Sequence, residues 1–209
     1  MVKTRELTLT AIFLSIILLF AFTPLGFINF GVIKATLIHV PVIIGAIVLG
    51  PRVGAFLGLA FGLISMLNST INPGPLSFVF SPFIPIIGTD HGSLWAIVIA
   101  FVPRILVGII PYYVYKLLKT RLPKMKTSLS LLIAGICGSL TNTLLVMNFI
   151  YFLFNPAYSQ LNEGLVGGNL YKLVLTVIIT NGIPEAIIAG LATSAVASVL
   201  IKLTQRNRT

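Results

Sequence analysis

The chain has 209 residues, of which 57% are hydrophobic and only 9% are charged, and its mean hydropathy is +1.07. Soluble domains carry about 25% charged residues, so this composition excludes a soluble globular protein and indicates an integral membrane protein. The net charge of +10 does not indicate nucleic-acid binding, because the basic residues lie in loops beside apolar runs. The sequence has no P-loop and no hydrolase or metalloprotease motif, so we predict neither ATP binding in this chain nor an enzyme.

Three apolar runs open the chain, at 7–28, 33–49 and 53–67. The first is too long for a signal peptide and no small-residue cleavage site follows it, so we predict a membrane span. The second and third meet at Gly50-Pro51, a pair typical of one helix ending and the next beginning. Glycines then recur every four residues and form a ridge that lets another backbone approach closely. The ridge predicts either tight packing or a sliding face for a partner or a gate. Its members are Gly50, Gly54, Gly58 and Gly62.

The segment from residue 68 to 92 interrupts this pattern. It is rich first in turn-forming residues and then in phenylalanine and proline. Long loops in compact proteins are often lids over binding sites. We interpret this segment as a long, apolar outer loop that packs on the bundle as a hairpin, covers a binding cavity, or does both.

Three further runs, 93–117, 129–154 and 171–203, complete the predicted spans. The last is longer than a bilayer requires, so a tilt, a protrusion or a kink at Pro184 is expected. We therefore predict an all-α membrane protein, with six transmembrane helices in one bundle and a single domain over residues 1–209. The apolar outer loop then joins the third and fourth helices.

Basic residues predict the orientation, since they collect in cytoplasmic loops. With the N-terminus inside, 11 of the 14 Lys and Arg residues face the cytoplasm, and both termini are cytoplasmic. The basic loop between the fourth and fifth spans would then face anionic lipid headgroups. The 11 residues are Lys3, Arg5, Arg52, Lys116, Lys119, Arg121, Lys124, Lys126, Lys202, Arg206 and Arg208.

Two charged residues lie inside predicted spans, Arg104 in the fourth and Glu185 in the sixth. Placing a charged side chain at the bilayer centre costs about 2.5 to 3.5 kcal/mol even on the membrane-insertion scales that give the lowest values, so each charge requires a stabilising partner. The two either neutralise each other or reach a bound solute. An arginine beside a cavity would hold a carboxylate with two hydrogen bonds, whereas a glutamate suits a hydroxyl, an amide or an amine.

Other polar or aromatic residues gather toward the outer ends of the predicted spans. Asparagine offers two donors and two acceptor lone pairs, so several helices that place such groups at one end describe an outward polar pocket. Taken singly, each residue favours a helix–helix hydrogen bond, whereas their shared position toward the outer ends favours a pocket. We predict no metal site, because no Cys or His accompanies His39 at ligand spacing. The candidate substrate-binding residues are His39, Asn68, Phe78, Phe80, Trp95, Arg104, Asn142, Asn148, Asn181 and Glu185.

Three motifs carry a family resemblance: Leu37-Ile-His-Val-Pro41, Pro103-Arg-Ile-Leu-Val-Gly108 and Asn181-Gly-Ile-Pro-Glu185. With the six-span layout, they make the chain resemble the substrate-binding S components of bacterial energy-coupling factor (ECF) vitamin transporters. The resemblance is strongest to the pantothenate branch, although cobalamin and hydroxymethylpyrimidine carriers share much of it. It implies a protein of the bacterial cell membrane that captures a vitamin outside. A coupling membrane subunit and two ATPase subunits would complete the transporter, so ATP would be used by those partners and this chain would need no cofactor.

The resemblance also implies a docking face. S components dock on the coupling subunit through small residues of the first helix, and Ala11 and Ser15 match that position. A second row of small residues on the sixth span predicts a helix contact, either internal or external. Its members are Ala186, Gly190, Ser194 and Ser198. Two other function classes fit less well. A membrane enzyme would need more ionisable residues, and a scaffold or ion-conducting bundle would not explain the outward polar cluster.

Overall fold

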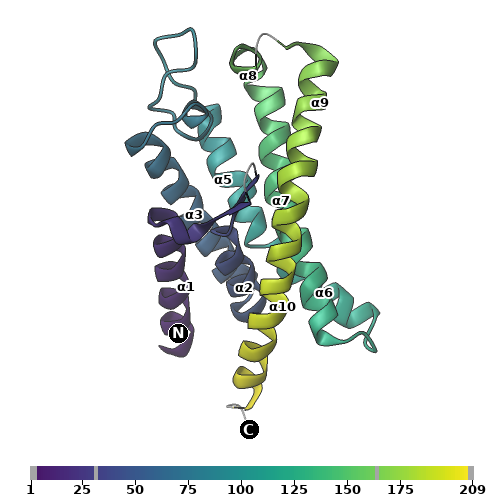
Figure 1. Ribbon diagram of the computed structural model, residues 1–209. Helices are drawn as coiled ribbons and strands as arrows, with labels where there is room; N and C mark the ends of the chain where they lie inside the picture. Colours follow the sequence, from purple (N-terminus) through teal and green to yellow (C-terminus); the bar gives the residue numbers. More distant parts are fainter. Residues whose placement is uncertain (1–3, 31–32, 163–164, 207–209) are drawn as a thin grey trace.

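The computed structural model describes residues 4–30, 33–162 and 165–206 and is an elongated bundle of helices (Figure 1). Within these ranges, five helical segments are long and apolar enough to cross a membrane, and a sixth, shorter apolar helix accompanies them. The helices are α1 (Thr4–Phe22), α2 (His39–Leu49), α3 (Pro51–Ile71), α4 (Ser77–Phe80), α5 (Trp95–Val107), α6 (Ile110–Arg121), α7 (Thr127–Leu153), α8 (Asn155–Leu161), α9 (Gly167–Val177) and α10 (Ile183–Arg206). The other elements are the 3-10 turn η1 (Pro24–Gly26), the strands β1 (Phe27–Phe30) and β2 (Ile33–Thr36), and the π-helical turn η2 (Ile178–Gly182).

The predicted extents of the first two spans are wrong. α1 stops at Phe22, because Pro24 disfavours a helical conformation in the residue before it. The chain then forms an antiparallel pair of strands in which Phe27 lies opposite Thr36. α2 consequently has only 11 residues, or roughly 16 Å of helix, which is shorter than the ~30 Å hydrocarbon core of a bilayer.

The glycine ridge of α3 lies inside the bundle, so the prediction of tight packing is confirmed and that of a face for a partner protein is wrong. Gly50 ends α2 and precedes α3 with a φ of 100°, a conformation that favours glycine. The next three ridge glycines face neighbouring backbone. A Cβ atom would overlap the carbonyl oxygen of Gly108 if built at Gly54, and that of Arg104 if built at Gly58. The ridge therefore lets α5 approach α3 closely at the level of Arg104.

This contact predicts a sensitive position. Gly58→Ala is expected to lower the free energy of unfolding by about 1 to 3 kcal/mol, the usual cost of overpacking, because the added methyl group must push α5 away from α3. Gly74→Ala is the matched control, since a Cβ at Gly74 meets nothing within 4 Å. Thermal unfolding of both variants in detergent measures the difference. Equal melting temperatures for the two variants would show that α5 can move away from α3 without loss of stability.

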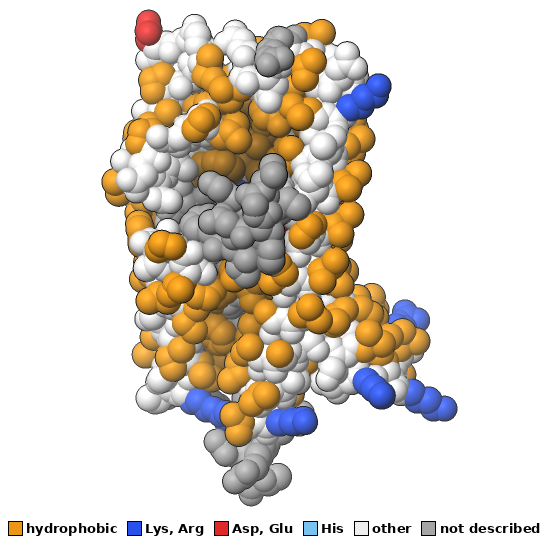
Figure 2. Space-filling view, viewed as in Figure 1, with side chains coloured by type: hydrophobic (Ala, Val, Ile, Leu, Met, Phe, Trp, Pro, Cys, Tyr) orange, Lys and Arg blue, Asp and Glu red, His pale blue; other side chains and the backbone are white. Residues whose placement is uncertain are grey.

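The predicted fourth span, 93–117, is divided into α5 and α6. Gly108 follows α5, and its backbone N–H donates to the carbonyl oxygens of Arg104 and Ile105. Pro111 lies in the first turn of α6. Beyond this break, α6 leaves the bundle at an angle (Figure 1). Lys and Arg side chains gather at this end of the molecule, where α1 also begins and α10 ends (Figure 2). Lys3 and Arg208 lie outside the described residues.

The sixth predicted span contains a change of helix type rather than a simple kink. η2 separates α9 from α10 and ends just before Pro184. Proline has no N–H group and its ring crowds the carbonyl four residues earlier, so the regular hydrogen-bond ladder cannot continue through this turn. Two small residues of α10 contact α7: a Cβ on Gly190 would lie 3.0 Å from the Leu132 carbonyl oxygen, and the Ser194 hydroxyl donates to the Ser128 carbonyl oxygen at 2.8 Å. This row is therefore an internal contact.

Candidate functional site

A cavity of about 390 Å³ lies among α3, α5, α7 and α10, with contributions from α1, α4, α9, β2 and η2. Its walls include Ala21, Ile38, Phe61 and Ile64 from one buried apolar cluster, and Val146 from a second. The cavity thus separates the two parts of the core. Its polar lining residues are Thr36, Ser65, Asn68, Ser69, Arg104, Asn142, Thr143, Asn181 and Glu185.

Helical spacing explains why these residues face the same space. On α3 the lining residues are 61, 64, 65, 68 and 69, which is the pattern of one helix face. On α7 they are 142, 143, 146 and 147, and across η2 they are 177, 181 and 185. All three sets lie toward the same end of their helices, away from the end where α1 begins. The cavity therefore occupies one half of the bundle.

Arg104 is the cation of the cavity, and its side chain is only 6% exposed. Its Nη1 donates a hydrogen bond of 2.7 Å to the carbonyl oxygen of Ile99. The guanidinium carbon lies 5.5 Å from the ring centre of Phe61 and 4.9 Å from that of Phe80, so two aromatic faces stabilise the charge. Its Nε is buried and has no hydrogen-bond partner among the described residues.

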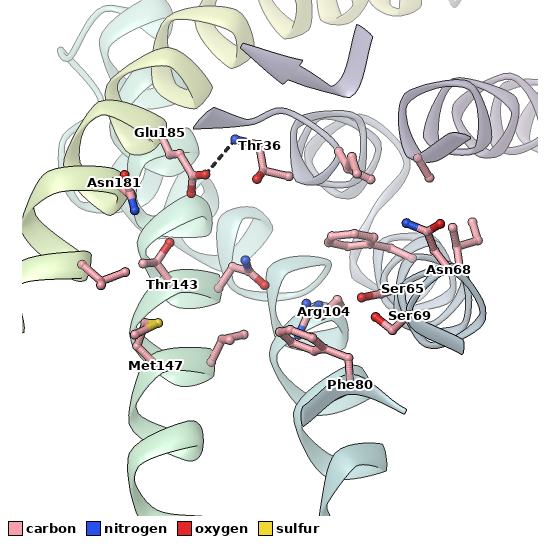
Figure 3. Close-up of a pocket in the computed structure, with 17 residues that line it drawn as sticks. Thr36, Ser65, Asn68, Ser69, Phe80, Arg104, Thr143, Met147, Asn181 and Glu185 are labelled. Atoms are coloured by element: carbon pink, nitrogen blue, oxygen red, sulfur yellow. Dashed lines mark hydrogen bonds between the residues drawn. The ribbon is translucent and has the colours of Figure 1, made fainter. Parts of the chain in front are cut away.

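Glu185 is the acidic group of the cavity and lies apart from Arg104 (Figure 3). Its Oε1 accepts a hydrogen bond of 2.7 Å from the backbone N–H of Thr36, which ties β2 to α10. In the part of the chain that the structure describes, no ion pair joins Glu185 to Arg104. The hypothesis that the two charges only neutralise each other is therefore not supported, and both instead line the same cavity.

Six of the ten candidate residues line this cavity. The four others do not: His39, Phe78, Trp95 and Asn148. Phe78 is only 2% exposed and packs edge-on against Phe154, at 5.7 Å between ring centres, so it anchors the loop rather than contacting a solute. The six are Asn68, Phe80, Arg104, Asn142, Asn181 and Glu185.

The remaining three candidates lie outside the cavity for separate reasons. His39 begins α2 in the core, and its buried Nε2 has no partner among the described residues. Trp95 begins α5 and is 54% exposed. Asn148 is half-buried; it donates its side-chain N–H to the carbonyl oxygen of Leu144 at 2.7 Å and accepts a hydrogen bond of 3.4 Å from the Tyr171 hydroxyl of α9, so it is a helix–helix contact.

Sequence reasoning missed four hydroxyl-bearing residues of the cavity. Ser65 and Ser69 share the face of α3 that carries Asn68, and Thr143 follows Asn142 on α7. Helical spacing from the asparagines would have found these three. Thr36 offered no such signal, because it belongs to a strand that was predicted as helix.

Ala11 and Ser15 lie on the exposed face of α1, away from the cavity. They line a shallow surface groove with Thr8, Ile12 and Leu19. The Ser15 hydroxyl donates to the carbonyl oxygen of Ala11 at 2.9 Å, so it is satisfied within its own helix. The surface at these positions is apolar and of low relief, which suits close approach of another helix.

The cavity is suited to bind a small polar solute. Besides Arg104 Nε, the Oδ1 atom of Asn142 is buried without a hydrogen-bond partner among the residues described. Buried polar groups are nearly always paired, so one unpaired donor and one unpaired acceptor on the lining indicate a ligand that supplies both. No cluster of three or more His, Cys, Asp or Glu residues occurs in the described ranges.

Comparison with known proteins identifies the family. A family model described as "ECF transporter, substrate-specific component" matches residues 5–197. The chain is 42% identical over 202 residues to the pantothenic acid transporter PanT of Lactococcus lactis subsp. cremoris, covering 96% of this chain and 95% of that protein. It is 31% identical over 212 residues to the pantothenate transporter PanT of Leuconostoc mesenteroides subsp. mesenteroides, covering 98% and 96%. Together with the apolar helices, these matches show that the chain is a multi-pass cell membrane protein and belongs to the substrate-specific components of ECF transporters.

Proposed function

We propose that this chain is the pantothenate-binding S component of an ECF importer. The observation that carries the proposal is the buried arginine of the cavity, which has no acidic partner among the described residues and whose Nε is unpaired. A buried charge without a partner is costly, so an anionic solute at this point stabilises the protein as well as the complex. Pantothenate is a monocarboxylate that also carries an amide and two hydroxyl groups.

The other lining groups fit the rest of this solute. Asparagine and hydroxyl side chains from α3, α7 and η2 supply donors and acceptors, and Ile64, Val146 and Val177 supply apolar contacts. The names of both relatives specify pantothenate or pantothenic acid, and their similarity spans nearly the whole chain. The proposal thus rests on the chemistry of the cavity and on relatives of matching length.

The cavity also argues against the other vitamins that the sequence left open. Its volume of about 390 Å³ is near the small end of the range for ligand pockets, about 300 to 1,000 Å³, which suits a small vitamin and not cobalamin. Hydroxymethylpyrimidine would fit by size but carries no carboxylate for Arg104.

We further propose six membrane crossings, with α2 as the short one and both termini in the cytoplasm. The basic residues at the end where α1 begins support this orientation, and it places the cavity in the outer half of the membrane. A coupling membrane subunit would bind the exposed groove at Ala11 and Ser15. Two ATPase subunits would supply energy, and this chain would itself bind no nucleotide and catalyse no reaction.

Isothermal titration of the purified protein with pantothenate, hydroxymethylpyrimidine and cobalamin tests the proposed substrate. We expect saturable one-to-one binding of pantothenate and no heat from the other two vitamins. Binding raises the melting temperature in proportion to ligand occupancy, so thermal unfolding is an independent measure. Tight binding of either other vitamin, or no binding of pantothenate, would contradict the proposal.

A further inference from the structure

The polar groups of the cavity are divided between two opposite ends (Figure 3). Arg104 lies at one end with Phe80 and with Ser65 and Ser69 of α3. Glu185 lies at the other end. One end therefore attracts an anion, and the other offers carboxylate oxygens that accept hydrogen bonds and disfavour an anion.

The middle of the cavity is contributed by α7. α7 packs against both α5 and α10, which carry Arg104 and Glu185 respectively. Asn142 belongs to α7, and its buried Oδ1 lacks a donor among the described residues. An amide N–H in the middle of a bound solute would satisfy this oxygen. The lining therefore presents a cation, an unpaired acceptor and a carboxylate in that order across the bundle.

The hydrogen bond to β2 determines what Glu185 can still do. Its Oε1 is held by the Thr36 backbone N–H, and Thr143 and Asn181 lie near its carboxylate (Figure 3). The side chains of Thr36 and Thr143 also hydrogen-bond to the carboxylate. A carboxylate has about four acceptor sites in all, so Glu185 can still accept a hydrogen bond from a solute in the cavity that it lines. A carboxylate oxygen in this setting forms a charge-assisted hydrogen bond with a solute hydroxyl, which is stronger than a bond between neutral groups.

We propose that the cavity fixes the direction of the bound solute. The carboxylate of pantothenate lies at Arg104, its amide N–H lies at Asn142, and its terminal hydroxyl lies at Glu185. Glu185 is thus a specificity-determining residue that recognises the end of the molecule opposite the acid. This inference rests on the proposed function and adds the orientation of the substrate.

A cycle that pairs changes in the ligand with changes in the protein tests this orientation. Pantothenol replaces the carboxylate by a hydroxymethyl group, and a deoxy analogue of pantothenate lacks the terminal hydroxyl. Both ligands and pantothenate are titrated against the unchanged protein, Arg104→Met and Glu185→Gln. Glu185→Gln keeps an oxygen for the Thr36 N–H while removing the charge. Arg121→Met on α6 is the matched control for loss of a cation outside the cavity.

For the unchanged protein and the control, pantothenol should bind roughly tenfold to hundredfold more weakly than pantothenate, the scale of a charged hydrogen bond. In Arg104→Met the difference in affinity between pantothenate and pantothenol should fall to roughly threefold or less, because the side chain that recognises the carboxylate has been removed. In Glu185→Gln the pantothenol difference should persist, and the penalty for the deoxy analogue should shrink instead.

Two results would overturn the orientation. The first is a pantothenol penalty of equal size in Arg104→Met and the unchanged protein. The second is a penalty for the deoxy analogue that Glu185→Gln leaves unaltered. If Arg104→Met does not fold, Arg104→Lys replaces it, and a reduced pantothenol penalty remains the expected result. Absence of pantothenate binding by the unchanged protein would instead refute the proposed function, and the orientation with it.

Discussion

Replacing Ala11 or Ser15 by tryptophan is expected to abolish vitamin uptake by the complete transporter and to leave vitamin binding intact. Both residues lie on the exposed face of α1, in a shallow groove that is separate from the cavity. A row of small residues lets two helices approach closely, so an indole ring at either position holds the coupling subunit away. The cavity shares no lining residue with the groove, so the affinity for the vitamin should be unchanged.

Uptake of labelled pantothenate by cells that carry the whole transporter measures the first effect, and titration of the purified chain measures the second. Leu129→Trp is the matched control, because Leu129 is also exposed but lies on α7. Its uptake should equal that of the unchanged protein. Normal uptake by both Ala11→Trp and Ser15→Trp would show that α1 is not the docking face.

Arg104→Lys is expected to weaken pantothenate binding by about 1.5 to 3 kcal/mol, the contribution of a hydrogen bond to a charged group. Lysine keeps the positive charge but loses the planar fork that binds a carboxylate with two hydrogen bonds. The melting temperature of the ligand-free protein should change little, because no ion pair to Glu185 is broken in the described structure. Titration and thermal unfolding in detergent separate the two effects.

The double variant Arg104→Leu with Glu185→Leu sharpens this test. Replacing both members of a buried ion pair by apolar residues is often neutral, so a purely structural pair would tolerate the change. We expect the double variant to remain folded and to lose pantothenate affinity, because both residues line the cavity. Native affinity in this variant would refute the role of Arg104 in holding the carboxylate.

Composition and local sequence patterns were sufficient to predict the class of protein and the course of most helices. α3 and α7 begin and end within four residues of their predicted bounds. Inside a membrane every backbone group must be paired within its own segment, so an apolar run of sufficient length has few alternatives to a helix. The break between α2 and α3 at Gly50-Pro51 was also predicted correctly, because a helix end of this kind depends only on adjacent residues. The three motifs likewise pointed to the family that the comparisons show.

Which residues face the cavity depends on how the helices pack, and this could not be predicted from the sequence. Depth along a span can be read from the sequence, but the direction of a side chain around the helix depends on distant partners. Asn142 and Asn148 belong to the same helix, yet only Asn142 faces the cavity, because position 148 lies opposite the middle of the helix face formed by residues 142, 143, 146 and 147. The pairing of β1 with β2 could likewise not be predicted from the sequence, since an apolar run of that length also suits a helix. Arg104 reaches the cavity as it does because Gly58 lets α5 pack against α3 at that level, a contact between segments far apart in the chain.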